Sequence, residues 1–175
     1  MKRLVLGMLI FVFIGGTALA FEPLSFPPPI NEGDVIIDVG VGLVHTGWAG
    51  NMLLPPLFAH VEYALPVGVP ISLGGGLAFY RWGTTGTWSW TMNIIDIAAR
   101  ANWHFGFDIS WLDFYAGVSL GYRIVIWDGW GTAVGTSGVS WSGQVGARFF
   151  FANNIGIVVE TGFPYLLKAG LTLRF

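Results

Sequence analysis

The chain has 175 residues, a formal net charge of −2 and a mean hydropathy of +0.65, and it contains no cysteine. Only 10% of its residues are charged, whereas soluble domains carry about 25%, so the composition is unlike that of an ordinary soluble domain. Eight basic residues against ten acidic ones give no basic face, and we expect no nucleic-acid partner. The lack of cysteine excludes disulfides, thiolate metal sites and a lipoprotein anchor.

Residues 1–20 predict a cleaved signal peptide. Lys2 and Arg3 form a positive start, Leu4–Ile14 is apolar, and Ala18-Leu-Ala20 is a small-x-small cleavage site. An uncleaved membrane helix is the alternative, but the apolar core is nearer in length to a signal peptide than to a span of about 20 residues. Without the signal peptide, the chain has six basic and ten acidic residues, a formal net charge of −4.

Residues 21–32 are rich in proline, including Pro27-Pro28-Pro29, and predict a periplasmic leader rather than a strand. After the signal peptide the sequence has no apolar run of about 18 residues, the length that a membrane helix needs. A chain this apolar must satisfy its backbone polar groups in another way, and in lipid the other solution is a closed β-barrel. Residues 33–175 therefore predict one outer-membrane β-barrel domain and no second domain.

Eight segments alternate apolar and polar residues with the period of a β-strand. They are 34–45, 57–65, 71–82, 90–105, 111–126, 139–151, 155–162 and 165–175. Turns after the second, fourth and sixth segments are short, and the other connections are mostly longer and richer in Gly and Trp. This pattern predicts an all-β fold, an eight-stranded antiparallel up-and-down transmembrane β-barrel with both termini in the periplasm. The connection at 46–56 is predicted to be the first outer loop.

A soluble lipocalin-like barrel or sandwich is the alternative for such a strand pattern. In a soluble barrel the apolar face would point inwards. Here the charges within the strands share a face with Gly, Ser and Ala, which are small enough for a narrow lumen. The alternation therefore favours an apolar outer face in lipid.

The predicted inner face carries five acidic and five basic side chains, so the signs balance. They are Asp38, Glu62, Asp96, Asp113, Glu160, Arg100, Arg123, Arg148, Lys168 and Arg174. Counting across the last hairpin places Glu160 opposite Lys168, with Arg148 diagonally near Glu160. Eight strands leave room for side chains only, so we expect a plugged, charge-paired core. An open aqueous path is the alternative.

The last eight residues, Lys168-Ala-Gly-Leu-Thr-Leu-Arg-Phe175, alternate polar and apolar and end on an aromatic residue. Lys168, Gly170, Leu173 and Phe175 resemble the C-terminal β-signal of bacterial outer-membrane barrels. The segment Asn93–Phe105 is similar to the fourth strand of that superfamily. The mature chain as a whole resembles the small eight-stranded barrels such as OmpX, OmpW and the barrel domain of OmpA.

That resemblance implies a bacterial outer-membrane location, contact with outer-membrane lipid and insertion by the barrel-assembly machinery. The sequence does not show the oligomeric state, and a monomer is the expectation. The predicted outer loops depart from those of an adhesin, because they are shorter and less charged. This departure argues against host binding, and we expect a structural or interaction role.

Two other functions remain open. The resemblance to OmpW implies a passive channel for small hydrophobic molecules, and the apolar segment Met52–Leu57 supports it. A lipid-A-modifying enzyme is a remote alternative, with His60, Glu62 and Ser72 as the candidate set. Those residues are predicted to face the lumen rather than the outer leaflet, so we expect no enzymatic activity. Three scattered histidines and no phosphate-binding loop predict neither a metal site nor a cofactor.

Overall fold

The computed structural model describes residues 30–44, 51–86, 89–105, 107, 109–129 and 136–175. The predicted signal peptide and residues 21–29 of the predicted leader lie outside the described residues. Among the described residues, no helix has the length and apolarity to cross a bilayer.

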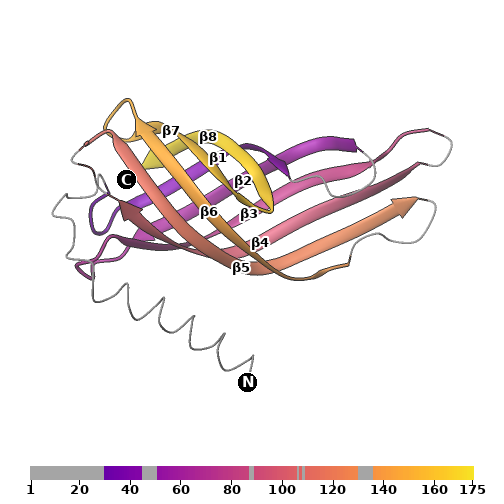
Figure 1. The fold of residues 1–175 in the computed structure, drawn as a ribbon, viewed down its shortest axis with the longest axis horizontal. Helices are drawn as coiled ribbons and strands as arrows, with labels where there is room; N and C mark the ends of the chain where they lie inside the picture. The colour runs from indigo at the N-terminus through magenta and orange to yellow at the C-terminus, as the bar shows by residue number, and fades with distance from the viewer. Residues whose placement is uncertain (1–29, 45–50, 87–88, 106, 108, 130–135) are drawn as a thin grey trace, which may run out of the picture.

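Eight antiparallel strands close into a single barrel (Figure 1). The strands are β1 Val35–Val44, β2 Asn51–Ala64, β3 Ile71–Thr84, β4 Trp90–Phe105, β5 Leu112–Gly129, β6 Gly138–Phe150, β7 Ile155–Phe163 and β8 Tyr165–Arg174. Each strand pairs with its neighbours in sequence, and β1 closes the barrel against β8. The predicted fold class is confirmed.

The two ends of the barrel differ. The terminal end carries the start of β1, the end of β8 and the turns that follow β2, β4 and β6. We call the opposite end the far end. There β4 and β5 remain paired up to Trp90 and Gly129, whereas β7 stops at Phe163, opposite Gly143. The strands β3 to β5 therefore project beyond the short β7–β8 hairpin (Figure 1).

The prediction of a loop over residues 46–56 was wrong for its described part. Residues from Asn51 onwards belong to β2, where Met52 pairs with Trp82 and Leu54 with Arg81. Register shifts occur on both sides of Leu54. Two consecutive prolines cannot donate to the ladder, and such irregularities allow a strand to tolerate them. The strand therefore continues through the proline pair Pro55-Pro56.

The distribution of apolar and charged residues between the outside and the inside of the barrel is the reverse of that in a soluble protein. Outward aliphatic residues are largely exposed, such as Val118 at 65% and Leu120 at 63%, while the charged residues predicted for the inner face are buried except Arg123 and Arg174, which are half-buried. Soluble proteins almost never bury charged residues unless these are paired. The candidate site therefore lies in the lumen.

Candidate functional site

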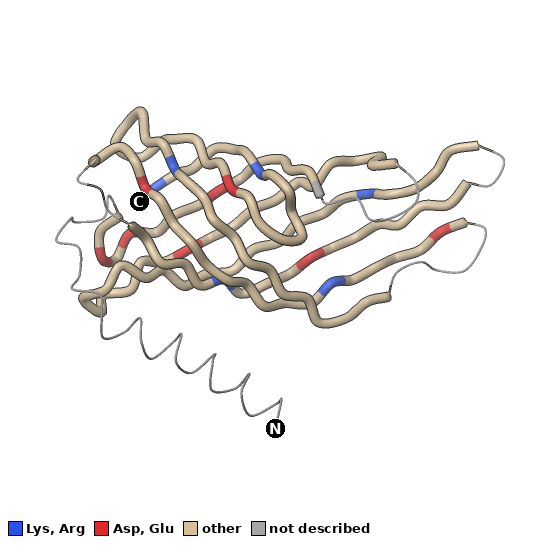
Figure 2. Tube along the Cα trace, viewed as in Figure 1, with Lys and Arg blue, Asp and Glu red and all other residues tan. Residues whose placement is uncertain are grey.

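A ring of charged side chains crosses the lumen in the half nearer the terminal end, and we call it the lumen cluster. Its members are Asp38, Glu62, Arg100, Asp113, Arg148, Glu160 and Lys168, each at most 6% exposed. Every strand except β3 supplies one of them, and Figure 2 shows charges spaced singly along the strands. On β3, Ser72, Gly74 and Gly76 occupy the inner positions and leave space for the longer side chains of the other strands.

Arg148 on β6 is the first centre of the cluster. Its Nη2 lies 2.7 Å from Asp38 Oδ2 and 2.8 Å from Glu62 Oε1. Its Nη1 lies 3.0 Å from Asp113 Oδ2, and its guanidinium carbon lies 4.2 Å from the centre of the Tyr115 ring. One guanidinium thus ties together three carboxylates from β1, β2 and β5, and charge-assisted hydrogen bonds of this kind are the strong ones.

Glu160 on β7 is the second centre. Arg100 Nη2 lies 2.6 Å from Glu160 Oε2, and the Tyr115 hydroxyl donates to the same oxygen at 2.8 Å. The Lys168 ammonium pairs with Glu160 Oε1. The register sets Glu160 directly opposite Lys168, the position obtained by counting across the hairpin.

The described ion pairs of Arg148 are not with Glu160, its expected diagonal neighbour. Arg148 lies opposite Val158 in the ladder, and its guanidinium points to the carboxylates of β1, β2 and β5. Tyr115 connects the two centres instead, because its ring stacks on Arg148 while its hydroxyl binds Glu160.

Asp96 and Arg123 form a separate pair nearer the far end. The Arg123 Nε and Nη2 atoms donate to the two Asp96 oxygens at 2.7 and 2.8 Å. The Tyr165 hydroxyl also donates to Asp96. The two residues lie opposite each other on β4 and β5, so this contact is a local cross-strand pair.

Arg174 lies at the terminal end. Its Nη2 donates to the Asn153 carbonyl at 2.5 Å, and its guanidinium lies 4.6 Å from the Phe150 ring centre. These contacts connect the end of β8 to the turn between β6 and β7, and the assignment of Arg174 to the lumen charges stays a prediction.

The residues of the predicted assembly signal all lie on β8 or directly after it. Leu173 pairs with Ile155 on one side, and a Cβ on Gly170 would lie 2.1 Å from the Val39 carbonyl oxygen. Phe175 is 66% exposed and exchanges two backbone hydrogen bonds of 2.9 Å with Val35. The C-terminal residue is therefore fixed at the closing seam of the barrel.

Towards the far end, the inner face changes from charged to apolar. Tyr80, Trp82, Met92 and Ile94 are at most 4% exposed and pack together. Residues packed around them are Met52, Trp90, Val125, Trp127 and Tyr165. This far-end apolar cluster closes the inside of the projecting strands.

The candidate catalytic set does not assemble as the sequence had suggested. His60 Nδ1 lies 2.8 Å from Arg100 Nη1, and Ser72 Oγ donates to Glu62 Oε2 at 2.8 Å. Ser72 Oγ also lies 2.9 Å from His104 Nε2, and His104 Nδ1 lies 2.9 Å from Asp113 Oδ1.

Sequence analysis missed this Ser–His–Asp arrangement. Its members are diagonal cross-strand neighbours, since Ser72 lies opposite Asn102 and His104 lies opposite Tyr115. Ser72 and Asp113 are 0% exposed, so the arrangement lies within the buried polar network.

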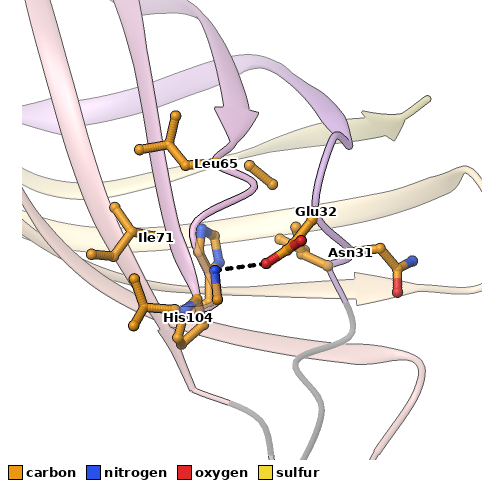
Figure 3. A pocket seen from close by; sticks show the side chains of 10 residues that line it. Asn31, Glu32, Leu65, Ile71 and His104 are labelled. Atoms are coloured by element: carbon orange, nitrogen blue, oxygen red, sulfur yellow. Dashed lines mark hydrogen bonds between the residues drawn. The ribbon is translucent and has the colours of Figure 1, made fainter.

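A cavity of about 260 Å³ opens at the terminal end, between residues 30–32 and the turn after β2 (Figure 3). His104 lies at its inner side, with Leu65 and Ile71 among the apolar lining residues. Glu32 accepts a hydrogen bond from the Gly68 backbone at 2.8 Å and so holds the rim together. Within the described part of the chain, no three His, Asp or Glu side chains are grouped as metal ligands.

No protein-family model and no curated protein matches the sequence. Solved structures do match. OprG from Pseudomonas aeruginosa superposes with a TM-score of 0.64 at 11% identity, covering 85% of this chain and 99% of that chain. The fold is that of the small eight-stranded outer-membrane barrels.

Two further outer-membrane barrels are similar. Ail from Yersinia pestis has a TM-score of 0.57 at 15% identity, covering 83% of this chain and all of that chain. The outer membrane protein W of E. coli has a TM-score of 0.51 at 15% identity, covering 83% of this chain and 99% of that chain. The resemblance inferred from the sequence is confirmed at the level of the fold.

Proposed function

We propose that this chain is an integral protein of the bacterial outer membrane with a structural or interaction role and a closed, charge-paired lumen. The outer face supports the membrane location. Trp103 and Trp111 are 40% and 52% exposed near the terminal end, where aromatic residues of outer-membrane barrels meet the headgroups. Trp103 on β4 pairs with Ile71 on β3, and Arg81 lies further along β3 towards the far end.

The height between these residues fits the apolar part of a membrane. The strand from Ile71 to Arg81 rises about 3.3 Å per residue and tilts by about 40°, which gives a height of about 25 Å. Arg81 is an exposed outward charge and is held by Asn93 at 2.8 Å. The apolar outer band of such barrels is about 25 Å tall, so the charge lies at its far boundary.

The proposed orientation places both termini in the periplasm. Short turns of outer-membrane barrels face the periplasm, and the terminal end carries the turns after β2, β4 and β6. The far end would then face outwards. The signal at Lys168, Gly170, Leu173 and Phe175 would be recognised by the barrel-assembly machinery, and a monomer in outer-membrane lipid is the proposed final state.

The lumen cluster is the observation that supports the proposal of a closed lumen. Arg148 extends from β6 to carboxylates on β1, β2 and β5, and its side chain is 0% exposed. A barrel of eight strands has an interior just wide enough for side chains to fill. These side chains fill the half of the lumen nearer the terminal end, and the far-end apolar cluster fills the other half.

Recording in planar bilayers tests this proposal. We expect no steady ion conductance from the folded wild-type protein. A variant in which Arg148, Asp38, Glu62 and Asp113 are all alanine leaves none of the carboxylates around Arg148 unpaired, and it should conduct only when Trp82 and Met92 of the far-end apolar cluster are alanine as well. Steady conductance of the wild-type protein would refute the closed lumen. Lipid A is expected to stay unmodified on expression, since Ser72 is inaccessible.

A passive channel for small hydrophobic molecules is the second candidate, and the far-end apolar cluster is the observation that favours it. Met92 and Ile94 are 0% exposed, so a ligand would have to displace packed side chains. Binding of an apolar probe would change the fluorescence of the tryptophans at this end. A saturable change that is lost in Met92→Asp would support the channel over a structural role.

A further inference from the structure

The six basic residues that follow the predicted signal peptide differ in their partners. Four of them pair with carboxylates inside the barrel: Arg100, Arg123, Arg148 and Lys168. Arg174 lies at the terminal end, on the last position of β8. Arg81 is the sixth, and among the described residues no carboxylate forms an ion pair with it.

Arg81 is exposed on the outward face of β3. Its Nε donates to Asn93 Oδ1 at 2.8 Å, and Asn93 is its direct partner on β4. The guanidinium carries four further N–H groups on Nη1 and Nη2, and no acceptor in the described part of the chain binds them. The planar fork of these two nitrogens fits two oxygens of one phosphate or carboxylate. A cross-strand hydrogen bond thus holds an unoccupied anion-binding group against the barrel wall.

The height of Arg81 on the barrel favours an anion that belongs to a lipid. Arg81 lies at the far boundary of the apolar band, where the headgroup region begins. Towards the terminal end on the same outward face, Leu77 and its partner Ile97 are each 54% exposed, so this part of the wall faces acyl chains. An outward charge is costly at the middle of the band and nearly neutral at its boundary. A phosphate at that depth would compensate the charge of Arg81 directly.

We propose that Arg81, held by Asn93, binds a phosphate of one lipid A molecule, whose acyl chains lie along Leu77 and Ile97. The choice of lipid A rests on the proposed orientation, which places the far end at the outer leaflet. The phosphates of lipid A are monoesters, and a monoester carries a charge of about −1.5 to −2 at neutral pH. Free phosphate has the same headgroup chemistry but no acyl chains.

Asp128 provides a matched control on the same outward band. It is exposed at the end of β5 and pairs with Thr91, two positions before Asn93 on β4. The strand β4 separates Asp128 from Arg81, and no ion pair joins them in the described structure. Asp128→Asn therefore changes the net charge by one unit without touching the Arg81 fork.

Native mass spectrometry of the folded chain in maltoside micelles measures the binding, because this detergent contains no phosphate. The probes are lipid A, lipid A from which the phosphates have been removed, and inorganic phosphate. We expect the wild-type barrel to retain one lipid A saturably and to bind the dephosphorylated lipid at least about tenfold more weakly, as for the loss of a hydrogen bond to a charged group. Equal retention of the two lipids would overturn the proposal. Displacement of lipid A by inorganic phosphate at the same concentration would show an ion site only and would overturn it as well.

Variants separate the Arg81 fork from general charge attraction. Arg81→Gln should lose the preference for lipid A over the dephosphorylated lipid, and Arg81→Lys should keep only part of it, because lysine has no planar fork. The double variant Arg81→Gln/Asp128→Asn restores the net charge and should still show no preference. A recovered preference in the double variant would refute the site. Heat-modifiable gel migration checks that each variant is folded.

The micelle experiment does not depend on the orientation in the membrane, which needs its own test. The chain has no cysteine, so Asp128→Cys introduces a single thiol at the far end. We expect a membrane-impermeant thiol reagent to label it on intact cells. Labelling without a lipid A preference would refute the site and leave the proposed function intact, whereas a lack of labelling would refute the orientation and with it the choice of lipid A.

Discussion

Glu160→Gln should strongly destabilise the barrel, because it removes the anion that pairs with Lys168. The described contacts left to the Lys168 ammonium are aromatic rings, Tyr165 at 4.9 Å and Phe58 at 5.4 Å from their centres. Stranding one partner of a buried ion pair costs about 3–5 kcal/mol. The new amide also places a donor against the ammonium, so we expect the upper part of that range.

Lys168→Met should cost less than Glu160→Gln. Glu160 keeps Arg100 at 2.6 Å and the Tyr115 hydroxyl at 2.8 Å. The loss is then one hydrogen bond to a charged group, about 1.5–3 kcal/mol. The double variant should be more stable than Glu160→Gln alone, because no unpaired ammonium remains in it.

Urea unfolding in lipid vesicles measures all three variants, and a double-mutant cycle separates coupling from general damage. Asp128→Asn is the control, since it removes an exposed charge at the end of β5 and should change the stability by less than about 0.5 kcal/mol. If the effects of Glu160→Gln and Lys168→Met add to within about 0.5 kcal/mol, the charge-paired lumen is refuted.

Three further predictions concern assembly and packing. Phe175→Ala should slow assembly and abolish heat-modifiable gel migration; wild-type amounts of folded protein in the membrane would contradict the assembly signal. Mass spectrometry of the outer-membrane fraction should find a mature protein that begins at Phe21, and a retained leader in an inner-membrane fraction would disprove the processing. Gly146→Ala should destabilise the barrel by about 1–3 kcal/mol through overpacking, because its Cβ would lie 2.4 Å from the Tyr115 ring. Gly143→Ala on the same strand meets nothing within 4 Å, and its unfolding curve should match the wild type.

The period of two in the sequence was enough to predict the strands and the residues that face inwards. Side chains alternate strictly along a strand, so Asp38, Arg100 and Glu160 could be assigned to the inner face without a structure. Pairs across one hairpin could be counted as well, as for Glu160 with Lys168. These are local relations that a sequence contains directly.

Contacts across the lumen could not be predicted in this way. Arg148 and Asp38 are 110 positions apart in sequence, and their contact depends on the stagger of all the strands between them. The Ser72–His104–Asp113 arrangement depends on the registers of two successive hairpins. The loop predicted over residues 46–56 was wrong in its described part for a different reason, since the pairing of Met52 and Leu54 with β3 is a tertiary relation that the local sequence does not show.

The closing seam between β1 and β8 has a consequence for the order of folding. Asp38 on β1 meets Arg148 on β6 only across a closed lumen. The charge network therefore cannot form from β1 to β6 before β8 has paired with β1. An open, partly synthesised sheet would present bare carboxylates and guanidinium groups, which hydrocarbon does not tolerate. Contacts this distant in sequence also form slowly. Insertion into the bilayer is therefore expected to be concerted with closure, and a chain truncated before β8 should remain outside the lipid and be degraded.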